Sequence, residues 1–275
     1  MIGLMDCNNF FVSCERLFRP DLQKVPVAVL SSNDGCIVAR SQEVKDLGVP
    51  MGIPYFQVKD VLTQAHAVLF SSNFTLYRDI STRVMNTLKD EVGYCDVYSI
   101  DATEADIHAI RTRIMKNVGL PVSIGVAKTK TLAKQASALA KKSTGVCILN
   151  DENTQQIKNL ACSSVWGLGR QTSAKLKEKG VVTIGDFLRM ERRVVRRDFG
   201  VSGERIYSEL QGICVYELGT TNEDVQQSIM STRSFEKTTN SLSELESAVA
   251  YHVNFASEKL REKKLVASRI HVLIQ

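Results

Sequence analysis

The sequence has few features of an exported or disulfide-bonded protein. Its seven cysteines are scattered, are odd in number and form no Cys-x-x-Cys pair, and its four histidines do not cluster. These patterns argue against a disulfide framework and a zinc site, and they fit a reducing cytoplasm. No run of about 18 apolar residues occurs, so we expect no membrane-spanning helix. The first residues also lack the basic lead and the cleavage site of a signal peptide.

Glycine-rich phosphate loops are also missing, since neither a Walker A motif nor Gly-x-Gly-x-x-Gly follows an expected strand. This argues against the nucleotide-binding α/β proteins that use those loops. The chain has 275 residues, of which 44% are apolar, and this is enough for two or three domains with cores of their own. The net charge of +5 is compatible with a polyanionic partner but does not require one.

Strand and helix patterns alternate through the first 150 or so residues. Apolar runs of strand length cover residues 2–5, 25–30, 97–100, 121–126 and 146–149. Helical spacing of apolar residues covers residues 72–88, 103–117 and 129–142. This alternation predicts a layered α/β or α+β domain.

The character of the chain changes after about Cys162. Residues 164–212 are helical in pattern, rich in arginine and punctuated by glycine, and a polar link covers residues 219–228. The rest predicts a strand at 231–235, a long helix at 243–263 and a strand at 267–274. A β-α-β segment of this kind leaves a poorly covered edge, so we interpret it as an unfinished domain.

Two expected strands each run into an aspartate, Asp6 and Asp101. A carboxylate at the end of a core strand is costly unless it is paired or bound to metal. Two of them on adjacent strands would repel each other, and divalent ions relieve that repulsion. The pair therefore suggests a two-metal phosphoryl-transfer site. For each aspartate taken alone, the cap of a turn is the favoured explanation.

Several segments carry a more specific signal. Residues 6–15 contain an aspartate, a pair of aromatics and a Ser-x-Glu, and residues 123–134 contain Gly-x-Ala-x-Thr-Lys-x-Leu-Ala-Lys. Further segments occur, in order, at residues 33–40, 98–101, 165–169 and 231–235. Together they resemble the UmuC-type subunit of the error-prone, Y-family DNA polymerases over nearly all of the chain.

The resemblance implies an α+β fold of the right-hand type, with a palm, fingers, a helical thumb containing a helix-hairpin-helix, and a partial little finger. The expected division is palm at residues 1–10 and 75–160, fingers at 11–74, thumb at 161–228 and partial little finger at 229–275. It also implies template-directed DNA synthesis past damage, with primer-template DNA and dNTPs as substrates.

The resemblance assigns roles at the palm. Asp6 and Asp101 would hold two Mg²⁺ ions, with the carbonyl of Cys7 as a further ligand. Phe10 and Phe11 would lie at the incoming nucleotide, where the Phe11 ring would exclude a 2′-hydroxyl. Without the motif, packing in the core is the favoured explanation of Phe11.

Lysines on the expected helix 129–142 share a face, since Lys130, Lys134 and Lys141 lie within about 40° of one another. The resemblance places Lys130 and Lys134 near the incoming triphosphate, together with Lys45. The charge pattern alone favours a solvated helix face. Gln42 stands where the family has a tyrosine, three residues before Lys45.

Glycines and arginines mark the expected thumb. Gly167 and Gly169, followed by a helix, fit a helix-hairpin-helix whose amides bind a DNA phosphate. Glycines that simply end helices are the alternative. The run at residues 189–197 holds five arginines, for which phosphate contact and a solvated face are comparable interpretations. By resemblance, Arg170 and Arg233 also contact DNA.

The pattern breaks after Asp101, because the family has glutamate next and this chain has Ala102. Glu104 is a poor substitute, since residues 103–106 read as a capping box that opens a helix. The return strand of the hairpin, about 5–6 residues at typical length, has no sequence to form it. We interpret the gap as an internal deletion.

Partners follow from the resemblance alone: a UmuD-type dimer, a recombinase filament and a sliding clamp, in the SOS response. The C-terminal part of the family, which docks proteins, has no counterpart here. The alternative function is a catalytically impaired DNA-binding remnant that lacks the acidic residue after Asp101.

Overall fold

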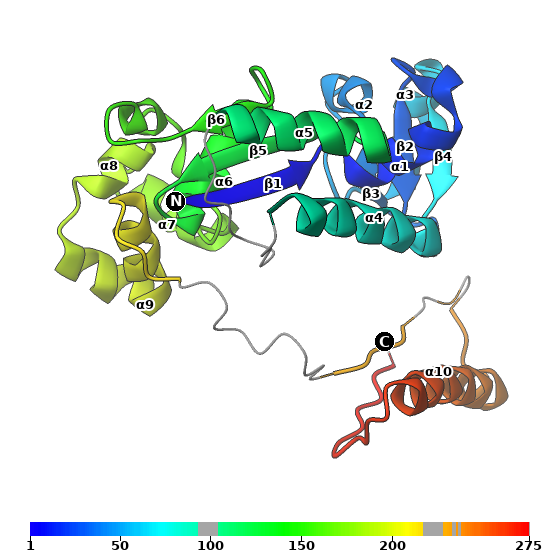
Figure 1. Ribbon diagram of the computed structural model, residues 1–275. Helices are drawn as coiled ribbons and strands as arrows, with labels where there is room; N and C mark the ends of the chain where they lie inside the picture. The colour runs from blue at the N-terminus through cyan, green and yellow to red at the C-terminus, as the bar shows by residue number, and fades with distance from the viewer. Residues whose placement is uncertain (93–103, 217–227, 233–234, 236–237, 275) are drawn as a thin grey trace. The chain divides into compact units, whose positions relative to one another are not determined.

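The computed structural model of the protein describes residues 1–92, 104–216, 228–232, 235 and 238–274. The chain divides into two compact units, Met1–Thr220 and Thr221–Gln275, and the first contains both β-sheets (Figure 1). Within the described ranges, no helix is both long enough and apolar enough to cross a lipid bilayer.

A three-stranded sheet lies at the centre of the first unit, in the order β1-β5-β6. Strand β1 (Ile2–Cys7) runs antiparallel to β5 (Val122–Ala127), and β5 runs parallel to β6 (Val146–Ile148). All six residues of β5 are buried, as expected for a central strand with both faces covered.

Different helices cover the two faces of this sheet (Figure 1). Helices α4 (Phe74–Val92) and α5 (Glu104–Val118) share one core with the side chains of Val122, Ile124 and Val126. Helix α6 (Lys130–Ala140) shares the other core with Ile2, Leu4 and Ala127. Since side chains alternate along a strand, Asp6 lies on the same face of β1 as Ile2 and Leu4, toward α6.

The second sheet has the order β3-β2-β4. Strand β2 (Val27–Leu30) is antiparallel to β3 (Ile37–Arg40), with an irregularity after Val29, and parallel to β4 (Val68–Ser71). The helices and 3₁₀ turns around it are α1 (Phe10–Phe18), η1 (Pro20–Leu22), α2 (Gln42–Asp46), η2 (Tyr55–Gln57) and α3 (Lys59–Gln64). A small core beneath this sheet includes Ile37, Val44 and Leu62.

A region of helices follows β6. They are η3 (Thr154–Ile157), η4 (Cys162–Ser164), α7 (Arg170–Glu178), α8 (Ile184–Leu188) and α9 (Arg192–Leu210). Helix α9 is interrupted at Gly200, whose φ of 67° is a conformation that glycine adopts without cost. Phe187 is fully buried at the centre of this region, where its ring meets those of Phe199 and Tyr207 edge-on.

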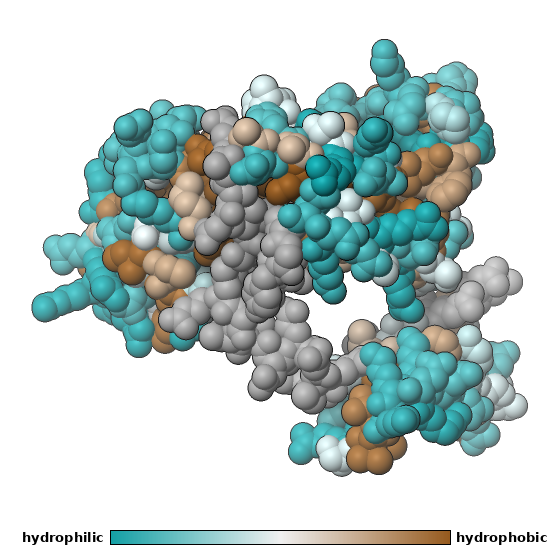
Figure 2. All heavy atoms as spheres, in the orientation of Figure 1, coloured by the Kyte–Doolittle hydropathy of each residue, from teal (hydrophilic) through white to brown (hydrophobic). Residues whose placement is uncertain are grey.

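The second unit contains helix α10 (Leu242–Glu262), which begins at the capping side chain of Ser241. Large apolar side chains remain exposed on this unit, among them Leu242 at 70% and Leu273 at 81% (Figure 2). The strand predicted at 267–274 is wrong, because the chain there has no strand conformation. A strand needs a hydrogen-bonded neighbour, and the described residues of this unit provide none.

Most other elements of the sequence prediction are confirmed within a few residues. The predicted strand at 97–100 lies outside the described residues. Of the strand predicted at 231–235, residues 233–234 lie outside them, and the other three residues have no strand conformation. The four-part division into palm, fingers, thumb and little finger stays a prediction. The boundary that the structure draws, between Thr220 and Thr221, falls inside the polar link.

Candidate active site

Asp6 lies near the end of β1, opposite Ser123 on β5. Its side chain is 26% exposed and accepts a hydrogen bond from Lys134 Nζ at 3.1 Å. Its second carboxylate oxygen forms an ion pair with Lys141. Burial alone would raise the pKa of Asp6, but the hydrogen bonds and positive charges of Lys141 and Lys134 outweigh burial and lower it below 3.8. The carboxylate is therefore ionised at neutral pH.

The close approach of α6 to the sheet brings these lysines to Asp6. A Cβ at Gly125 would lie 2.0 Å from the backbone nitrogen of Ser137, so only glycine fits between strand and helix. Lys134 is within α6 and Lys141 is its C-cap, seven residues on. Two helical turns separate them, which places both on one face.

A buried carboxylate fixes the start of α6. The backbone N–H of Thr131 donates to Glu209 Oε2 at 3.0 Å, and the N–H groups of Val215 and Tyr216 donate to Oε1 at 2.8 and 3.1 Å. Thr129 caps α6 and donates its hydroxyl to the Glu209 carbonyl at 2.8 Å. The negative charge at a helix N-terminus is favourable, and this contact ties α9 to α6.

Lys45 reaches the site from α2. Its Nζ donates to Asn9 Oδ1 at 2.5 Å, across 36 positions of sequence. Burial lowers the pKa of Lys45, and the positive charges of Lys141 and Arg40 lower it further. Asn9 is the N-cap of α1 and has φ 47° and ψ 47°, a left-handed conformation that asparagine tolerates better than most residues.

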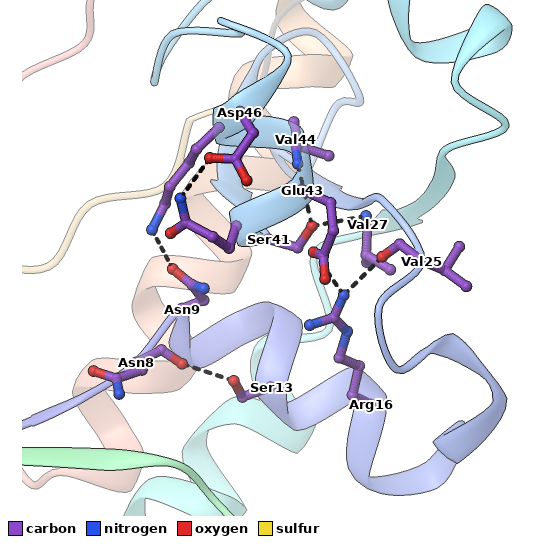
Figure 3. A network of polar contacts seen from close by, with 12 residues as sticks. Asn8, Asn9, Ser13, Arg16, Val25, Val27, Ser41, Glu43, Val44 and Asp46 are labelled. Atoms are coloured by element: carbon purple, nitrogen blue, oxygen red, sulfur yellow. Dashed lines mark hydrogen bonds and ion pairs between the residues drawn. The ribbon is translucent and has the colours of Figure 1, made fainter. Parts of the chain in front are cut away.

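The side chains of Ser41 and Arg16 hold α2 in place (Figure 3). The Ser41 hydroxyl accepts hydrogen bonds from the backbone N–H groups of Val27 and Val44, at 3.1 and 3.4 Å. Arg16 of α1 donates to Glu43 at 2.9 Å and to the Val25 carbonyl at 2.7 Å. These contacts orient the short helix that carries Lys45.

The turn after β1 is anchored at Asn8. Its backbone N–H donates to the Pro121 carbonyl at 2.8 Å. The Ser13 hydroxyl donates to the Asn8 carbonyl at 2.7 Å. The Ser123 hydroxyl donates to the side-chain oxygen of Asn8 at 3.1 Å. The turn between Asp6 and Phe10 is thus attached to both α1 and β5.

Phe11 lies in an aromatic group beside this turn. Its ring stacks on Tyr77, with 4.1 Å between centroids and 13° between planes, and meets Phe74 edge-on at 6.1 Å. Phe10, the first residue of α1, lies 6.0 Å from Phe11 between ring centroids. Burial, together with the hydrogen bond that the Tyr77 hydroxyl donates to Glu15, raises the pKa of Tyr77.

The described residues contribute one carboxylate to a cation site. No group of three or more His, Cys, Asp or Glu side chains suited to a metal occurs among them. The oxygens of Asp6 are the hard ligands that Mg²⁺ prefers. Burial and the charge of Asp6 raise the pKa of the Cys7 thiol to about 11, so it stays protonated. Asp101 and Arg233 lie outside the described residues.

Lys141 is the site residue that the sequence did not assign. Lys141 follows Lys134 by seven positions, so the helical spacing placed both lysines on one face. This spacing was the signal in the sequence that could have added Lys141 to the site. Lys130 is the first residue of α6, one turn before Lys134.

Gly167 and Gly169 differ in their surroundings. Gly167 has φ 91°, and a Cβ there would lie 2.6 Å from the side chain of Ile206. Gly169 has φ −63° and open space around it, and it caps α7, whose first residue is Arg170. Packing against Ile206 thus explains why residue 167 is glycine. The backbone conformation and packing of Gly169 leave room for a side chain.

The arginine run at 189–197 is largely paired with acids. Arg192 and Arg196 both contact Glu204. Arg189 pairs with Asp186, and Arg197 with Asp198. In the described part, four of the five arginines thus contact an acid, but only three carboxylates supply these contacts, and Asp198 is shared with Lys179. Neither sequence interpretation included this arrangement.

Comparison with known proteins identifies the family. Residues 5–138 match the impB/mucB/samB family, and residues 226–275 match its C-terminal domain. The protein UmuC of Salmonella typhimurium is 39% identical over 95% of this chain and 66% of UmuC. The protein SamB of that species is 35% identical over 100% of this chain and 69% of SamB. DNA polymerase IV of Bacillus velezensis is 27% identical over 98% of this chain and 69% of its own length.

Solved structures share the fold. DinB from Sulfolobus solfataricus matches with a TM-score of 0.66 at 22% identity, over 76% of this chain and 66% of that one. A chimeric Y-family DNA polymerase built from Dbh and Dpo4 matches with a TM-score of 0.73 at 18% identity, over 94% and 80%.

The chain is shorter than its relatives, and it spans about two thirds of the length of the curated ones named above. The SamB match extends over 295 aligned positions, whereas this chain has 275 residues, so about 20 positions of SamB have no counterpart within it. This agrees with an internal deletion. On its motifs, its fold and these matches, the chain belongs to the impB/mucB/samB family, the UmuC-type branch of the Y-family DNA polymerases.

Proposed function

We propose that this chain is an error-prone, DNA-directed DNA polymerase that extends primers past damaged template bases. The observation that carries the proposal is the ionised carboxylate of Asp6, surrounded by the ammonium groups of Lys134, Lys141 and, from α2, Lys45. A carboxylate suits a divalent cation and lysines suit a triphosphate, and nucleotidyl transfer brings these two charged partners together. The relationship to UmuC and to DNA polymerase IV supports the same activity.

The cofactor we propose is Mg²⁺, with two ions held by Asp6, Asp101 and the backbone carbonyl of Cys7. When bound, the ions lower the pKa of the primer 3′-hydroxyl and stabilise the negative charge that develops at the α-phosphate. Asp6 fits this role because it is ionised, partly exposed and fixed at a strand end.

The chain's own residues bind and orient the nucleotide in this proposal. Lys45, Lys134 and Lys141 hold the triphosphate as point charges, with Lys130 further along the same helix. Phe10 and Phe11 lie at the sugar, where the Phe11 ring, supported by Tyr77, excludes a 2′-hydroxyl.

DNA would be held by the helical region. The open N-terminus of α7 at Gly169 and Arg170 presents backbone N–H groups that suit one phosphate of the duplex. Gly167 shapes the turn before it, and Arg233 is a further proposed DNA contact. In this scheme residues 1–10 and 75–160 are the palm, 11–74 the fingers, 161–228 the thumb and 229–275 a partial little finger.

The cellular setting is proposed from the family. A UmuD-type dimer, a recombinase filament and a sliding clamp would be the partners, in the cytoplasm and during the SOS response. About a third of the relatives' length has no counterpart in the sequence. Binding of each partner by this chain therefore needs its own test.

A second candidate is a catalytically impaired DNA-binding remnant. Ala102 stands where the family has the acidic residue after Asp101, and about 20 positions are missing relative to SamB. Such a protein would keep the phosphate-binding elements and lose nucleotide incorporation.

Primer extension separates the two candidates. The measurement uses the full chain, a primed template, dNTPs and Mg²⁺, with Mn²⁺ as a more permissive ion. Extension that Asp6→Ala abolishes and Asp151→Ala retains supports the polymerase, since Asp151 is a surface aspartate paired with Lys128. DNA binding without incorporation in either metal supports the remnant. A duplex affinity that does not change with salt contradicts both candidates.

A further inference from the structure

Both oxygens of the Asp6 carboxylate already have a positively charged partner in this structure. Lys134 Nζ lies 3.1 Å from one oxygen, and Lys141 forms an ion pair with the other. The lysine side chains are 40% and 41% exposed, so each ammonium group could move into water without crossing the core. The two lysines therefore occupy the positions that a cation would take on Asp6, through contacts that are reversible.

The backbone that carries the lysines is fixed while their side chains are free to move. Gly125 lets α6 touch the sheet, Glu209 binds its first turn, and the N–H of Lys141 donates to the Ser137 carbonyl at 3.2 Å. Four methylene groups separate each ammonium from this rigid base. A change in the occupant of Asp6 can thus be accommodated by lysine rotamers without movement of α6.

Among the described residues, the balance of charge around Asp6 is positive. Lys45, Lys134 and Lys141 bring three ammonium groups near this one carboxylate, while Arg40 and Asp46, which also act on Lys45, have opposite charges. A divalent cation that enters adds two more positive charges at a distance where repulsion is strong. Entry therefore requires that at least one ammonium leave the carboxylate.

We propose that Lys141 is a built-in competitor of divalent cations at Asp6, and that the cation binds there only after Lys141 has moved away. The proposal extends the function proposed above in one respect: a triphosphate that attracts Lys141 would vacate the carboxylate oxygen and make cation binding follow nucleotide binding. The competition itself concerns only Asp6, Lys141 and a cation, and it can be measured without nucleotide or DNA.

The test measures Mn²⁺ binding to the full chain from the electron paramagnetic resonance signal of free Mn²⁺. Lys141→Met removes the competing charge and keeps the length of the side chain. Lys142→Met is the matched control, because it makes the same charge change at the next, exposed position. We expect Lys141→Met to bind Mn²⁺ about tenfold more tightly than the unmodified chain, and Lys142→Met to change the affinity less than about twofold.

A double variant assigns any gain to Asp6. Combining Lys141→Met with Asp6→Asn should remove the added Mn²⁺ affinity. Affinity that stays unchanged or falls in Lys141→Met, or a gain that persists in the double variant, overturns the proposal. Lys141→Gln serves as a second variant and should give the same gain. Failure of primer extension alone would count against the proposed function and leave this competition standing.

A metal-free arm tests the link to nucleotide. With EDTA present, inorganic triphosphate should bind more weakly to Lys141→Met and more tightly to Asp6→Asn than to the unmodified chain. Asp6→Asn would release Lys141 from its ion pair and make it available to the anion. Equal binding by all three proteins would contradict the link between the anion and the cation at Lys141.

Discussion

The ring of Phe11 lies face to face with the ring of Tyr77, with 4.1 Å between their centroids. Tyr77 is buried, and its hydroxyl donates a 2.7 Å hydrogen bond to Glu15. The partly exposed Phe11 therefore packs against a side chain that burial and a hydrogen bond hold in one conformation. A rigid ring of this kind can exclude an atom, whereas a mobile one would only make room for it.

The first prediction concerns sugar selection. Phe11→Ala should raise the incorporation of ribonucleotides relative to deoxyribonucleotides by up to about a hundredfold. A pocket that rejects the 2′-hydroxyl of a ribonucleotide by shape alone discriminates by about this factor. The measurement is the ratio of kcat/KM for a matched pair of nucleotides. Phe74→Ala is the control, since Phe74 also touches Phe11 but is 54% exposed. An unchanged ratio in Phe11→Ala would contradict the proposed role.

The second prediction concerns the contact between α6 and the sheet. Gly125→Ala places a methyl group 2.0 Å from the backbone of Ser137, so strand and helix must separate. We expect the free energy of unfolding to fall by about 2–4 kcal/mol, measured by urea denaturation. Ser137→Ala is the control on the helix side. It removes a buried hydroxyl that has no hydrogen-bond partner, so it should change stability by less than about 1 kcal/mol.

The third prediction concerns Glu209. In Glu209→Gln one carboxylate oxygen becomes an NH₂ group that faces backbone N–H donors and cannot accept from them. We expect a loss of about 2–3 kcal/mol in the free energy of unfolding. Glu204→Gln changes the same group where it pairs with exposed arginines, so we expect a clearly smaller loss in the free energy of unfolding. Equal effects in the two variants would show that burial of Glu209 is not what matters.

The fourth prediction concerns pH. Hydrogen bonds from Thr183 and Val182 at the start of α8 lower the pKa of Asp186 from 3.8 to about 2. A depressed pKa in the folded state stabilises the fold above the unfolded value and loses this effect as pH falls toward the folded value. The difference in Tm between the unmodified chain and Asp186→Ala should therefore be largest above pH 5 and shrink toward pH 2. A difference that does not depend on pH would contradict this.

The sequence predicted the parts of the fold that are local. The apolar residues of α5 recur at helical spacing and those of β5 form a short buried run, and each pattern depends on neighbours in the chain. The strand at 267–274 was predicted on the same grounds and is wrong, because a strand also needs a partner.

The candidate site was predictable only in part, for a similar reason. Asp6 and Lys134 belong to motifs, and the resemblance indicated Lys45. Lys141 acts through its position on a helix face, and Glu209 binds Thr131, which lies 78 positions away. Arg192 and Arg196 pair with Glu204, which lies 12 and 8 positions further along and is brought close only when the chain folds. Asp101 stays a prediction, because it lies outside the described residues.

Because Gly125 has no side chain, helix α6 lies close to strands β1 and β5, and this spacing determines how long a basic side chain on the helix must be to reach Asp6. Lysine suffices because the helix axis lies as near to the strand as backbone atoms permit. In a relative with alanine at this position, the helix would have to stand further out, and the longer side chain of arginine would be needed to span the gap. Glycine here and lysine at 134 and 141 should therefore change together during evolution, although glycine itself never touches a charged group.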